Sequence, residues 1–292
     1  MRSRLIRWLL RGFAALPLPL AHAAGTVIGW GLILIPNELR RISRINIPLC
    51  LPELTPAQQR HLLHASLIEA GKTMGEAGAL WLWPASRLLG LVRSVSGEDQ
   101  LRALLTGGKG VILATPHLGA WEMMGLYSSA NYPITSLYRP PRLTEMNDIV
   151  RHGRERLGAK LVPVDASGVR AMFQALGRGE AVGILPDQEP GPSNGVFAPL
   201  FGIRANTMAL LSRLAIKTGA AVIFCYAERL PRGQGYHLHF LPASTSINQE
   251  PLETSVTTMN AMVETLIRQR PEQYQWGYKR FRTRPDTEAK IY

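Results

Sequence analysis

From about residue 55 onward, the apolar positions follow two alternating patterns, one typical of helices and one typical of buried strands. Thr55 before Pro56 predicts the start of a long helix that runs toward Trp81, since threonine caps helices and proline suits the first turn. Short apolar runs bounded by Gly and Pro predict strands at 111–114, 134–138, 181–185, 220–226 and 236–241. Helical patterns separate several of these strands, at 143–157, 168–178, 205–218 and 254–269. The sequence therefore predicts an α/β fold, with a mostly parallel central sheet flanked by helices.

The N-terminus has a different pattern, because no Asp, Glu, Lys or Arg occurs from Gly12 to Asn37. This length is near the ~20 residues that cross a hydrocarbon core, but Pro17, Pro19 and several glycines disfavour one uniform helix. Arginines flank the run on both sides, at positions 2, 4, 7, 11, 40, 41 and 44. We expect residues 1–44 to form a membrane-associated helical anchor and residues 45–292 to form the functional domain. A cleaved signal peptide and a buried core helix are the alternatives.

Charge and composition limit the function classes. The chain has 292 residues, a formal net charge of +12, 46% hydrophobic residues and 18% charged residues, which excludes a disordered protein. The positive charge favours an acidic partner, such as an anionic membrane, an acidic protein or an acidic substrate. No helix-turn-helix, zinc-finger or RNA-binding signature is visible, which disfavours nucleic acid. Cys50 and Cys225 are far apart in sequence, so we expect reduced thiols rather than a disulfide framework or a Cys-rich metal site.

Candidate chemistry begins directly after the first predicted strand, where His117 and Glu122 are five positions apart. On one continuous helix this spacing would point the two side chains apart. They can meet only if His117 lies in the strand-to-helix turn and Glu122 lies in the first turn of the helix. A carboxylate that orients an imidazole makes a general base, and with no Ser or Cys nucleophile nearby the simplest reaction is deprotonation of a substrate hydroxyl. A helix-capping His117 and a surface Glu122 are the structural alternative.

Three further motifs follow in order, with Pro186-Asp187-Gln188 and the later segment 195–202 counted together as one. Tyr138-Arg139-Pro140 and Pro186-Asp187-Gln188 each come directly after a predicted strand, and ligands bind at the carboxyl ends of parallel strands. The segment 195–202 (Gly-Val-Phe-Ala-Pro-Leu-Phe-Gly) leads to Arg204. Pro-Glu-Gln-Tyr-Gln-Trp at 271–276 precedes Arg-Phe at 280–281.

With these four motifs, nearly the whole chain resembles the late acyltransferases of lipid A biosynthesis, of the lauroyl/myristoyl transferase type within the lysophospholipid acyltransferase superfamily. The box His-x4-Glu is His117 to Glu122 here, and Pro-Glu-Gln-Tyr-x-Trp is typical of this branch. Pro116 precedes the box where many members have Asn, which changes the turn but not the acid–base pair.

The resemblance implies an O-acyltransferase on the cytoplasmic face of the bacterial inner membrane. Such an enzyme transfers a fatty acyl group from acyl carrier protein to the hydroxyl of a 3-hydroxyacyl chain on a phosphorylated glucosamine disaccharide. It implies no metal or organic cofactor. His117 would remove the hydroxyl proton and Glu122 would orient His117.

Substrate contacts are expected from strand-end residues. Arg139 would bind a phosphate or the oxyanion, because guanidinium groups offer two parallel hydrogen bonds. Asp187 and Gln188 would orient Arg139 or the sugar, and Arg170 and Arg204 are further candidates for phosphate binding. Each of these residues also has a structural alternative. Arg139 could form a surface ion pair, Asp187 could cap the next turn, and Arg170 and Arg204 could belong to a solvated face. A basic C-terminal cluster suits acyl carrier protein or lipid phosphates, at Arg268, Arg270, Lys279, Arg280, Arg282 and Arg284.

The sequence leaves several alternatives open. The acceptor could be another membrane lipid, such as a lysophospholipid, a phosphoinositide mannoside or an ornithine lipid. A hydrolase that activates water and a basic membrane-binding protein without activity are further alternatives. Acyl chain length, the accepting hydroxyl, Kdo dependence and oligomeric state are not determined by the sequence.

Overall fold

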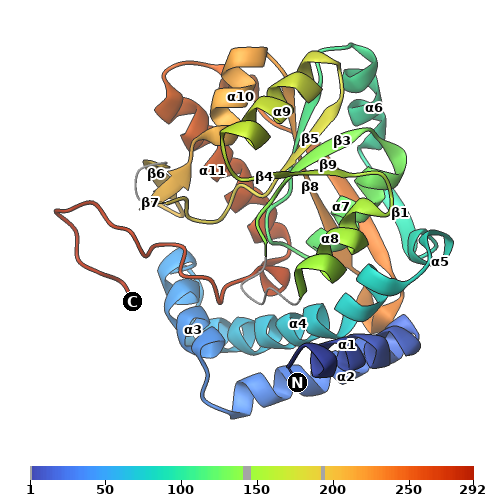
Figure 1. Cartoon of the computed structure of the whole chain (residues 1–292). Coiled ribbons are helices and arrows are strands. Elements are labelled where there is room, and N and C mark those ends of the chain that lie inside the picture. Colours follow the sequence, from blue (N-terminus) through green and yellow to red (C-terminus); the bar gives the residue numbers. More distant parts are fainter. Residues whose placement is uncertain (1, 141–145, 192–194) are drawn as a thin grey trace.

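The computed structural model describes residues 2–140, 146–191 and 195–292. A seven-stranded sheet forms the centre, in the order β1-β9-β8-β2-β5-β3-β4. All its neighbouring strands are parallel except β8 and β9. The mostly parallel sheet is thus confirmed (Figure 1). Its strands are β1 (Val92–Ser96), β2 (Val111–Ala114), β3 (Ile134–Tyr138), β4 (Lys160–Pro163), β5 (Ala181–Ile184), β8 (Ala221–Arg229) and β9 (Tyr236–Pro242).

Helices cover both faces of this sheet, which explains the unbroken apolar runs of the central strands. In β2, Ile112 and Ala114 belong to one buried cluster, and Val111 and Leu113 belong to another. The first cluster contains residues of α9 (Ala166–Gly177), α10 (Leu210–Thr218) and α11 (Leu252–Gln269). The second contains residues of α5 (Ala85–Leu89), α6 (Glu98–Thr106) and α7 (Trp121–Asn131). Burial on both sides therefore selects strands without polar alternation.

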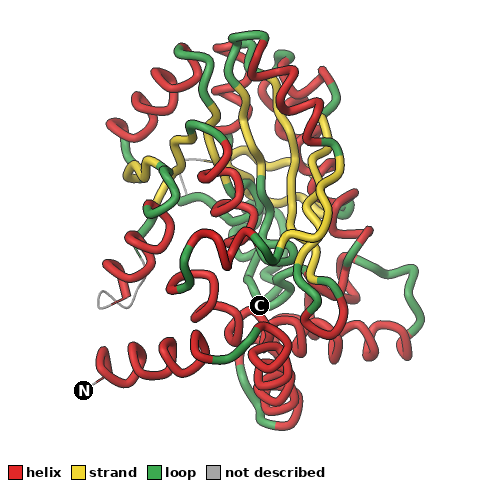
Figure 2. The backbone as a smooth tube through the Cα atoms, turned by 90° about the vertical axis from the view of Figure 1, so that its right-hand side faces the viewer, coloured by secondary structure: helices red, strands yellow, loops and turns green. Residues whose placement is uncertain are grey.

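The N-terminal helices form a separate layer below the sheet, seen at the bottom of Figure 1 and again in Figure 2. They are α1 (Arg2–Ala15), α2 (Leu18–Leu34), α3 (Glu38–Cys50) and the long α4 (Pro56–Leu82), which the Thr55 capping box begins as predicted. Helices α2 and α4 pack very closely: a Cβ atom on Gly71 would lie 2.1 Å from the carbonyl oxygen of Gly25. Gly25 and Gly29 of the charge-free run are therefore packing positions, and α2 is partly a packed helix.

The expected N-terminal membrane helix is not confirmed as a single span. The charge-free run breaks at Pro17, between α1 and α2, as its prolines indicated. Within the described residues no one helix is both long and apolar enough to cross a membrane, although α2 and α3 together, bent by 80°, satisfy the criterion by length and composition.

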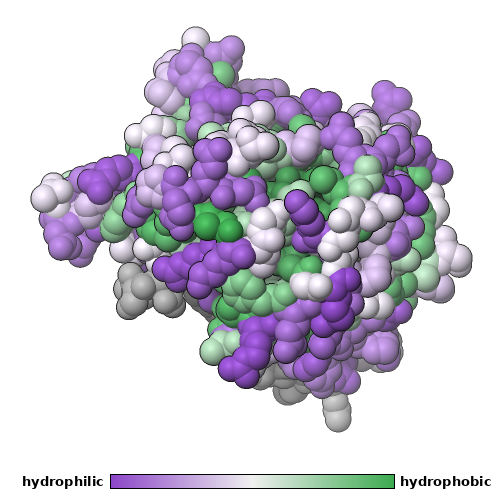
Figure 3. Space-filling view, turned by 90° about the horizontal axis from the view of Figure 1, so that it is seen from above, coloured by the Kyte–Doolittle hydropathy of each residue, from purple (hydrophilic) through white to green (hydrophobic). Residues whose placement is uncertain are grey.

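Exposed large apolar side chains nevertheless concentrate in this layer. Among the described residues, all the strongly exposed ones except Val164 belong to α1, α2 and α4 or directly follow α2: Trp8, Leu9, Leu20, Val27, Trp30, Leu34, Ile35, Met74 and Leu82. We call these nine residues the apolar base. The opposite face, over α6, α9 and α10, shows mostly polar side chains with smaller apolar areas (Figure 3).

Two sequence predictions need correction or restriction. The helix expected at 205–218 begins only at Leu210, because the preceding residues form β7 (Ile203–Met208), which pairs with β6 (Gly195–Leu200) as an antiparallel hairpin. Tertiary pairing thus overrides a local helical pattern. The helix expected at 143–157 is α8 (Asn147–Glu155), and positions 143–145 lie outside the described residues.

Candidate active site

Parallel pairing of β2 and β5 creates the core of the site. Ala114 is the register partner of Ile184, so the two strands end side by side. Three residues further along each chain segment come His117 and Asp187, which therefore face one another at the carboxyl edge of the sheet. The imidazole Nδ1 of His117 lies 2.8 Å from Asp187 Oδ1, and the backbone N–H of His117 donates to Asp187 Oδ2 at 2.9 Å.

This carboxylate determines which nitrogen of His117 can act as a base. Burial alone would raise the pKa of Asp187, but the attraction of His117 and the two hydrogen bonds outweigh burial and lower it. The ionised carboxylate accepts the Nδ1 proton, and Nε2 then carries the lone pair. The Gln188 side-chain Nε2 lies 3.1 Å from His117 Nε2 and donates to it. The side-chain amide of Gln188 thus occupies the position beside Nε2 that a proton-donating group would take.

The turn that holds His117 depends on a glycine. Gly119 has a φ of +60°, and a Cβ there would lie 2.0 Å from the carbonyl oxygen of Ala227. The backbone N–H of Ala120 donates to that same carbonyl at 2.8 Å. His117 therefore lies in a strand-to-helix turn and Glu122 lies in the first turn of α7, as the spacing predicts.

The carboxylate that binds His117 is not the one that the sequence indicated. Glu122 Oε2 accepts from Arg154 Nε of α8 at 2.9 Å, Arg154 Nη2 donates to Glu122 Oε1, and Trp81 Nε1 lies 3.4 Å from Oε2. Burial would raise the pKa of Glu122, but Arg154 above all lowers it, and the charge of His117 contributes less. The imidazole is instead oriented by Asp187, because the β2–β5 register brings Asp187 to Nδ1. The sequence led us to expect that Asp187 and Gln188 orient Arg139 or the sugar. In the structure both side chains instead lie within hydrogen-bond distance of the His117 imidazole.

Two apolar cavities flank the site. One of about 330 Å³ extends from α4 to Trp121 and Glu122, and one of about 170 Å³ extends from α4 to the segment 273–277. Thr73, Met74 and Trp121 line both cavities. The Trp121 ring also contacts the imidazole of His117, with ring centroids 5.1 Å apart. The His117 imidazole thus lies beside space that suits hydrocarbon chains rather than polar substrates.

A buried ionic network forms one wall of the larger cavity. Arg229 donates to both carboxylate oxygens of Glu76, at 2.6 to 3.0 Å, and to the carbonyl oxygen of Gly119 at 3.0 Å. His22 of α2 and Tyr236 of β9 bond the same carboxylate at 3.0 and 2.9 Å. This network joins the N-terminal layer to the turn that follows His117.

Comparison with known proteins identifies the family of this chain. A family model described as bacterial lipid A biosynthesis acyltransferase matches residues 4–283. The chain belongs to this family. Its relatives include the lipid A biosynthesis lauroyltransferase of Escherichia coli K12, 29% identical over 96% of this chain and 90% of the relative. The palmitoleoyltransferase of the same strain is 29% identical over 98% and 92%. A phosphatidylinositol mannoside acyltransferase of Mycolicibacterium smegmatis is 28% identical over 79% and 72%.

In this acyltransferase the C-terminal Pro-Glu-Gln-Tyr-Gln-Trp motif supports the turn around His117. The carbonyl of Gln273 accepts from the backbone N–H of Gly119 at 3.0 Å, and the N–H of Gln275 donates to the carbonyl of His117 at 3.1 Å. The Gln273 side chain pairs with both backbone groups of Arg229, at 2.9 and 3.1 Å. The motif therefore stabilises the backbone of the site.

The three remaining arginine candidates are all exposed. Arg139 directly follows β3 at the carboxyl edge of the sheet, and Arg170 lies on α9. Arg204 of β7 lies 3.8 Å from Glu288 and its guanidinium lies 5.8 Å from the centroid of Phe197. The structure therefore does not bring Arg170 or Arg204 into the hydrogen-bonded group around His117.

The basic C-terminal cluster has internal partners in the described chain. Arg280 is buried and bonds the backbone of Asn206 and the Thr207 hydroxyl. The other five pair with carboxylates, namely Arg268 with Glu53 and Glu264, Arg270 with Glu228, Lys279 with Glu38, Arg282 with Glu189 and Arg284 with Glu288. These pairs reduce the charge that the cluster can offer to a partner.

Sequence reasoning missed Arg154 and Trp81 as partners of Glu122. Arg154 is about thirty positions from Glu122 and has no motif around it, so no local pattern could indicate the pair. The expectation of free thiols is confirmed, since Cys50 and Cys225 are buried and unbridged.

Proposed function

We propose that this protein transfers a fatty acyl group from acyl carrier protein to the hydroxyl of a 3-hydroxyacyl chain on a lipid A precursor. The observation that most strongly supports this reaction is the imidazole of His117, held through Nδ1 by a buried carboxylate beside two apolar cavities. The names of the lipid A relatives support the acceptor. The absence of a Ser or Cys nucleophile in the motif favours direct transfer.

In the proposed mechanism, the acceptor hydroxyl displaces the Gln188 amide from Nε2 of His117. Nε2 takes the hydroxyl proton while the oxygen attacks the thioester carbonyl carbon. Asp187 stabilises the imidazolium that forms, as a carboxylate oriented toward Nδ1 does. The C–S bond of the tetrahedral intermediate then breaks, and the thiolate receives the proton that His117 holds. The displaced Gln188 amide supplies a hydrogen-bond donor close to the developing oxyanion.

We assign Glu122 a role different from direct contact with His117. Its ion pair with Arg154 orders the start of α7 and the indole of Trp81, and its negative charge favours the imidazolium. This assignment keeps both residues of the His-x4-Glu box in the site, with His117 as the base and Glu122 as a positioning residue.

The two cavities are proposed to hold the acyl chain and the hydrocarbon part of the acceptor. Arg139, at the same edge of the sheet, is proposed to bind an acceptor phosphate, with Arg170 and Arg204 as outer contacts. Acyl carrier protein, which is acidic, would be attracted by the net charge of +12.

The proposed location is the cytoplasmic face of the bacterial inner membrane. The apolar base would insert among acyl chains, with Arg7 and Arg11 of α1 and the arginines of α3 at the headgroups. This orientation places the cavities beside α4 near the bilayer, where a lipid acceptor can reach His117.

A second candidate acceptor is a phosphoinositide mannoside, because a relative of that name matches most of this chain. The deciding experiment offers purified enzyme acyl carrier protein thioester with a phosphorylated lipid A precursor, a phosphoinositide mannoside or a lysophospholipid. We expect transfer to the lipid A precursor to dominate. Equal or faster transfer to another acceptor would refute the substrate class, and release of free fatty acid alone would support a hydrolase. Mass spectrometry of lipid A from cells lacking the gene would identify the missing chain.

A further inference from the structure

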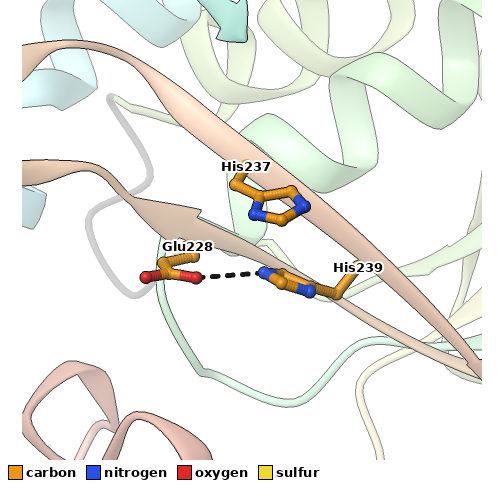
Figure 4. Close-up of side chains that lie close together, drawn as sticks. All are labelled: Glu228, His237 and His239. Atoms are coloured by element: carbon orange, nitrogen blue, oxygen red, sulfur yellow. Dashed lines mark hydrogen bonds and ion pairs between the residues drawn. The ribbon is translucent and has the colours of Figure 1, made fainter. Parts of the chain in front are cut away.

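A second cluster of titratable side chains, outside the hydrogen-bonded group around His117, lies on β8 and β9. Glu228 of β8 is the register partner of His237 of β9, and His239 is two residues further along β9. The three side chains point toward one another (Figure 4). One ligand atom from each lies within 4.8 Å of the others, and Glu228 Oε2 lies 3.0 Å from His239 Nε2.

One of the three spacings between these atoms matches that of a tetrahedral metal ion, and all three lie within 4.8 Å. Zinc bonds to nitrogen and oxygen of about 2.0–2.1 Å place neighbouring ligand atoms about 3.3 Å apart. The separation of 3.0 Å between Glu228 Oε2 and His239 Nε2 is close to this value. The rings of His237 and His239 are also unusually near, with centroids 3.9 Å apart. Neutral imidazole is the form that binds metals.

Neighbouring groups orient each of the three side chains. Ser96 Oγ lies 2.8 Å from His237 Nε2, which leaves Nδ1 for a metal. The ring of His239 stacks on Tyr226 at 4.5 Å and 8°. Arg270 Nε donates to Glu228 Oε1 at 2.6 Å, which directs Oε2 toward the histidines. Hydrogen bonds of this kind to the second atom of a ligand are typical of metal sites.

We propose that Glu228, His237 and His239 form a structural binding site for a divalent transition-metal ion of the zinc class. The ligands would be Glu228 Oε2, His237 Nδ1 and His239 Nε2, with a fourth position for water. Two nitrogen ligands and one oxygen ligand suit zinc, and cobalt(II) can replace zinc as a spectroscopic probe. The ion would join β8 to β9, directly before Arg229 and its network with Glu76. The proposal is independent of the acyl acceptor.

The test uses full-length protein in detergent, with any polyhistidine tag removed and metals stripped by a chelator. Zinc chloride and cobalt(II) chloride are then titrated while stoichiometry, visible absorption and Tm are measured. We expect one ion per chain and the intense visible bands of four-coordinate cobalt. Zinc at a hundredfold excess over Kd should raise Tm by about 4 °C for a chain of this size.

His237→Gln and His239→Gln should abolish these three signals, and the metal-free Tm of each variant shows whether it folds. His64→Gln on α4, which is exposed and distant in sequence from the cluster, is the matched control and should behave as wild type. The proposal is wrong if wild-type protein binds no stoichiometric ion. It is equally wrong if the double variant His237→Gln/His239→Gln gives the same cobalt spectrum and the same zinc-induced rise in Tm.

Discussion

Replacing Asp187 by Asn tests the proposed base most directly, because the change is nearly isosteric. In the native site both carboxylate oxygens accept hydrogen bonds, one from the His117 backbone N–H and one from Nδ1–H. An amide has only one oxygen. If that oxygen keeps the backbone N–H, the amide NH₂ faces Nδ1 and forces the imidazole proton onto Nε2. The base nitrogen then has no lone pair for the substrate.

The expected loss can be estimated from these two contacts. A hydrogen bond to a charged group contributes about 1.5–3 kcal/mol, and Asp187 also stabilises the imidazolium by its charge. Together these effects raise the barrier by about 3–5 kcal/mol, which is about 10²–10⁴-fold in kcat. KM should change little, because Asp187 contacts His117 rather than the cavities.

The assay measures initial rates of acyl transfer from acyl carrier protein thioester, with Tm as a check on folding. Asp99→Asn, at an exposed position of α6, is the matched control and should keep full activity. Glu122→Gln is a useful comparison, since it should also lower activity but through Arg154. If Asp187→Asn retained more than about a third of the wild-type kcat at unchanged Tm, the assignment would be refuted, since loss of a general base costs at least about 10²-fold.

The same geometry supports four further predictions. His117→Ala should remove about 10²–10⁴-fold of the transfer rate without loss of folding, measured in the same assay; activity above a tenth of wild type would assign the base elsewhere. Glu76→Gln should destabilise the protein by about 3–5 kcal/mol in denaturant titration, because it leaves the buried guanidinium of Arg229 with only the longer contact to Glu69, at 3.5 Å, as a carboxylate partner. Burial would raise the pKa of Glu76, but Arg229 and His22 lower it to about 2. Stability from Glu76 is therefore complete above about pH 4.5 and should be lost as pH falls toward 2, a loss absent from Glu76→Gln. The double variant Trp30→Glu/Leu34→Glu should co-sediment less with anionic vesicles than the wild type does, at unchanged Tm. If the double variant binds vesicles as well as the wild type in high salt, the apolar base is not the membrane contact. Arg139→Lys should lower activity on a phosphorylated acceptor, since an ammonium group cannot form a bidentate contact, and an unaffected rate would make Arg139 a surface charge.

Local patterns were sufficient to predict the central architecture. The apolar runs at 111–114 and 181–185 predict β2 and β5 because full burial on both faces requires apolar side chains at every position. The Thr55-Pro56 start of α4 and the turn around His117 are also local, since capping and glycine geometry depend on adjacent residues. The four motifs, each a short run of neighbouring residues, were sufficient to indicate the family.

The hairpin of β6 and β7 could not be predicted in this way. Its second strand was expected to be helical at 205–208, because the sequence there fits a helix when taken alone. Pairing with β6 supplies backbone hydrogen bonds that no local pattern encodes. Gly25 and Gly29 of α2 are a similar case, since their role depends on the position of α4.

The partners of the site residues were decided by tertiary structure. Sequence distance favoured Glu122 as the carboxylate for His117, only five positions away. The parallel register of β2 and β5 instead brings Asp187, seventy positions away, to Nδ1, while α8 brings Arg154 to Glu122. Sequence alone could thus determine which residue types gather at the carboxyl edge of the sheet. Their hydrogen-bond pairing depends on strand register and helix packing, which fix distances between side chains that are remote along the chain.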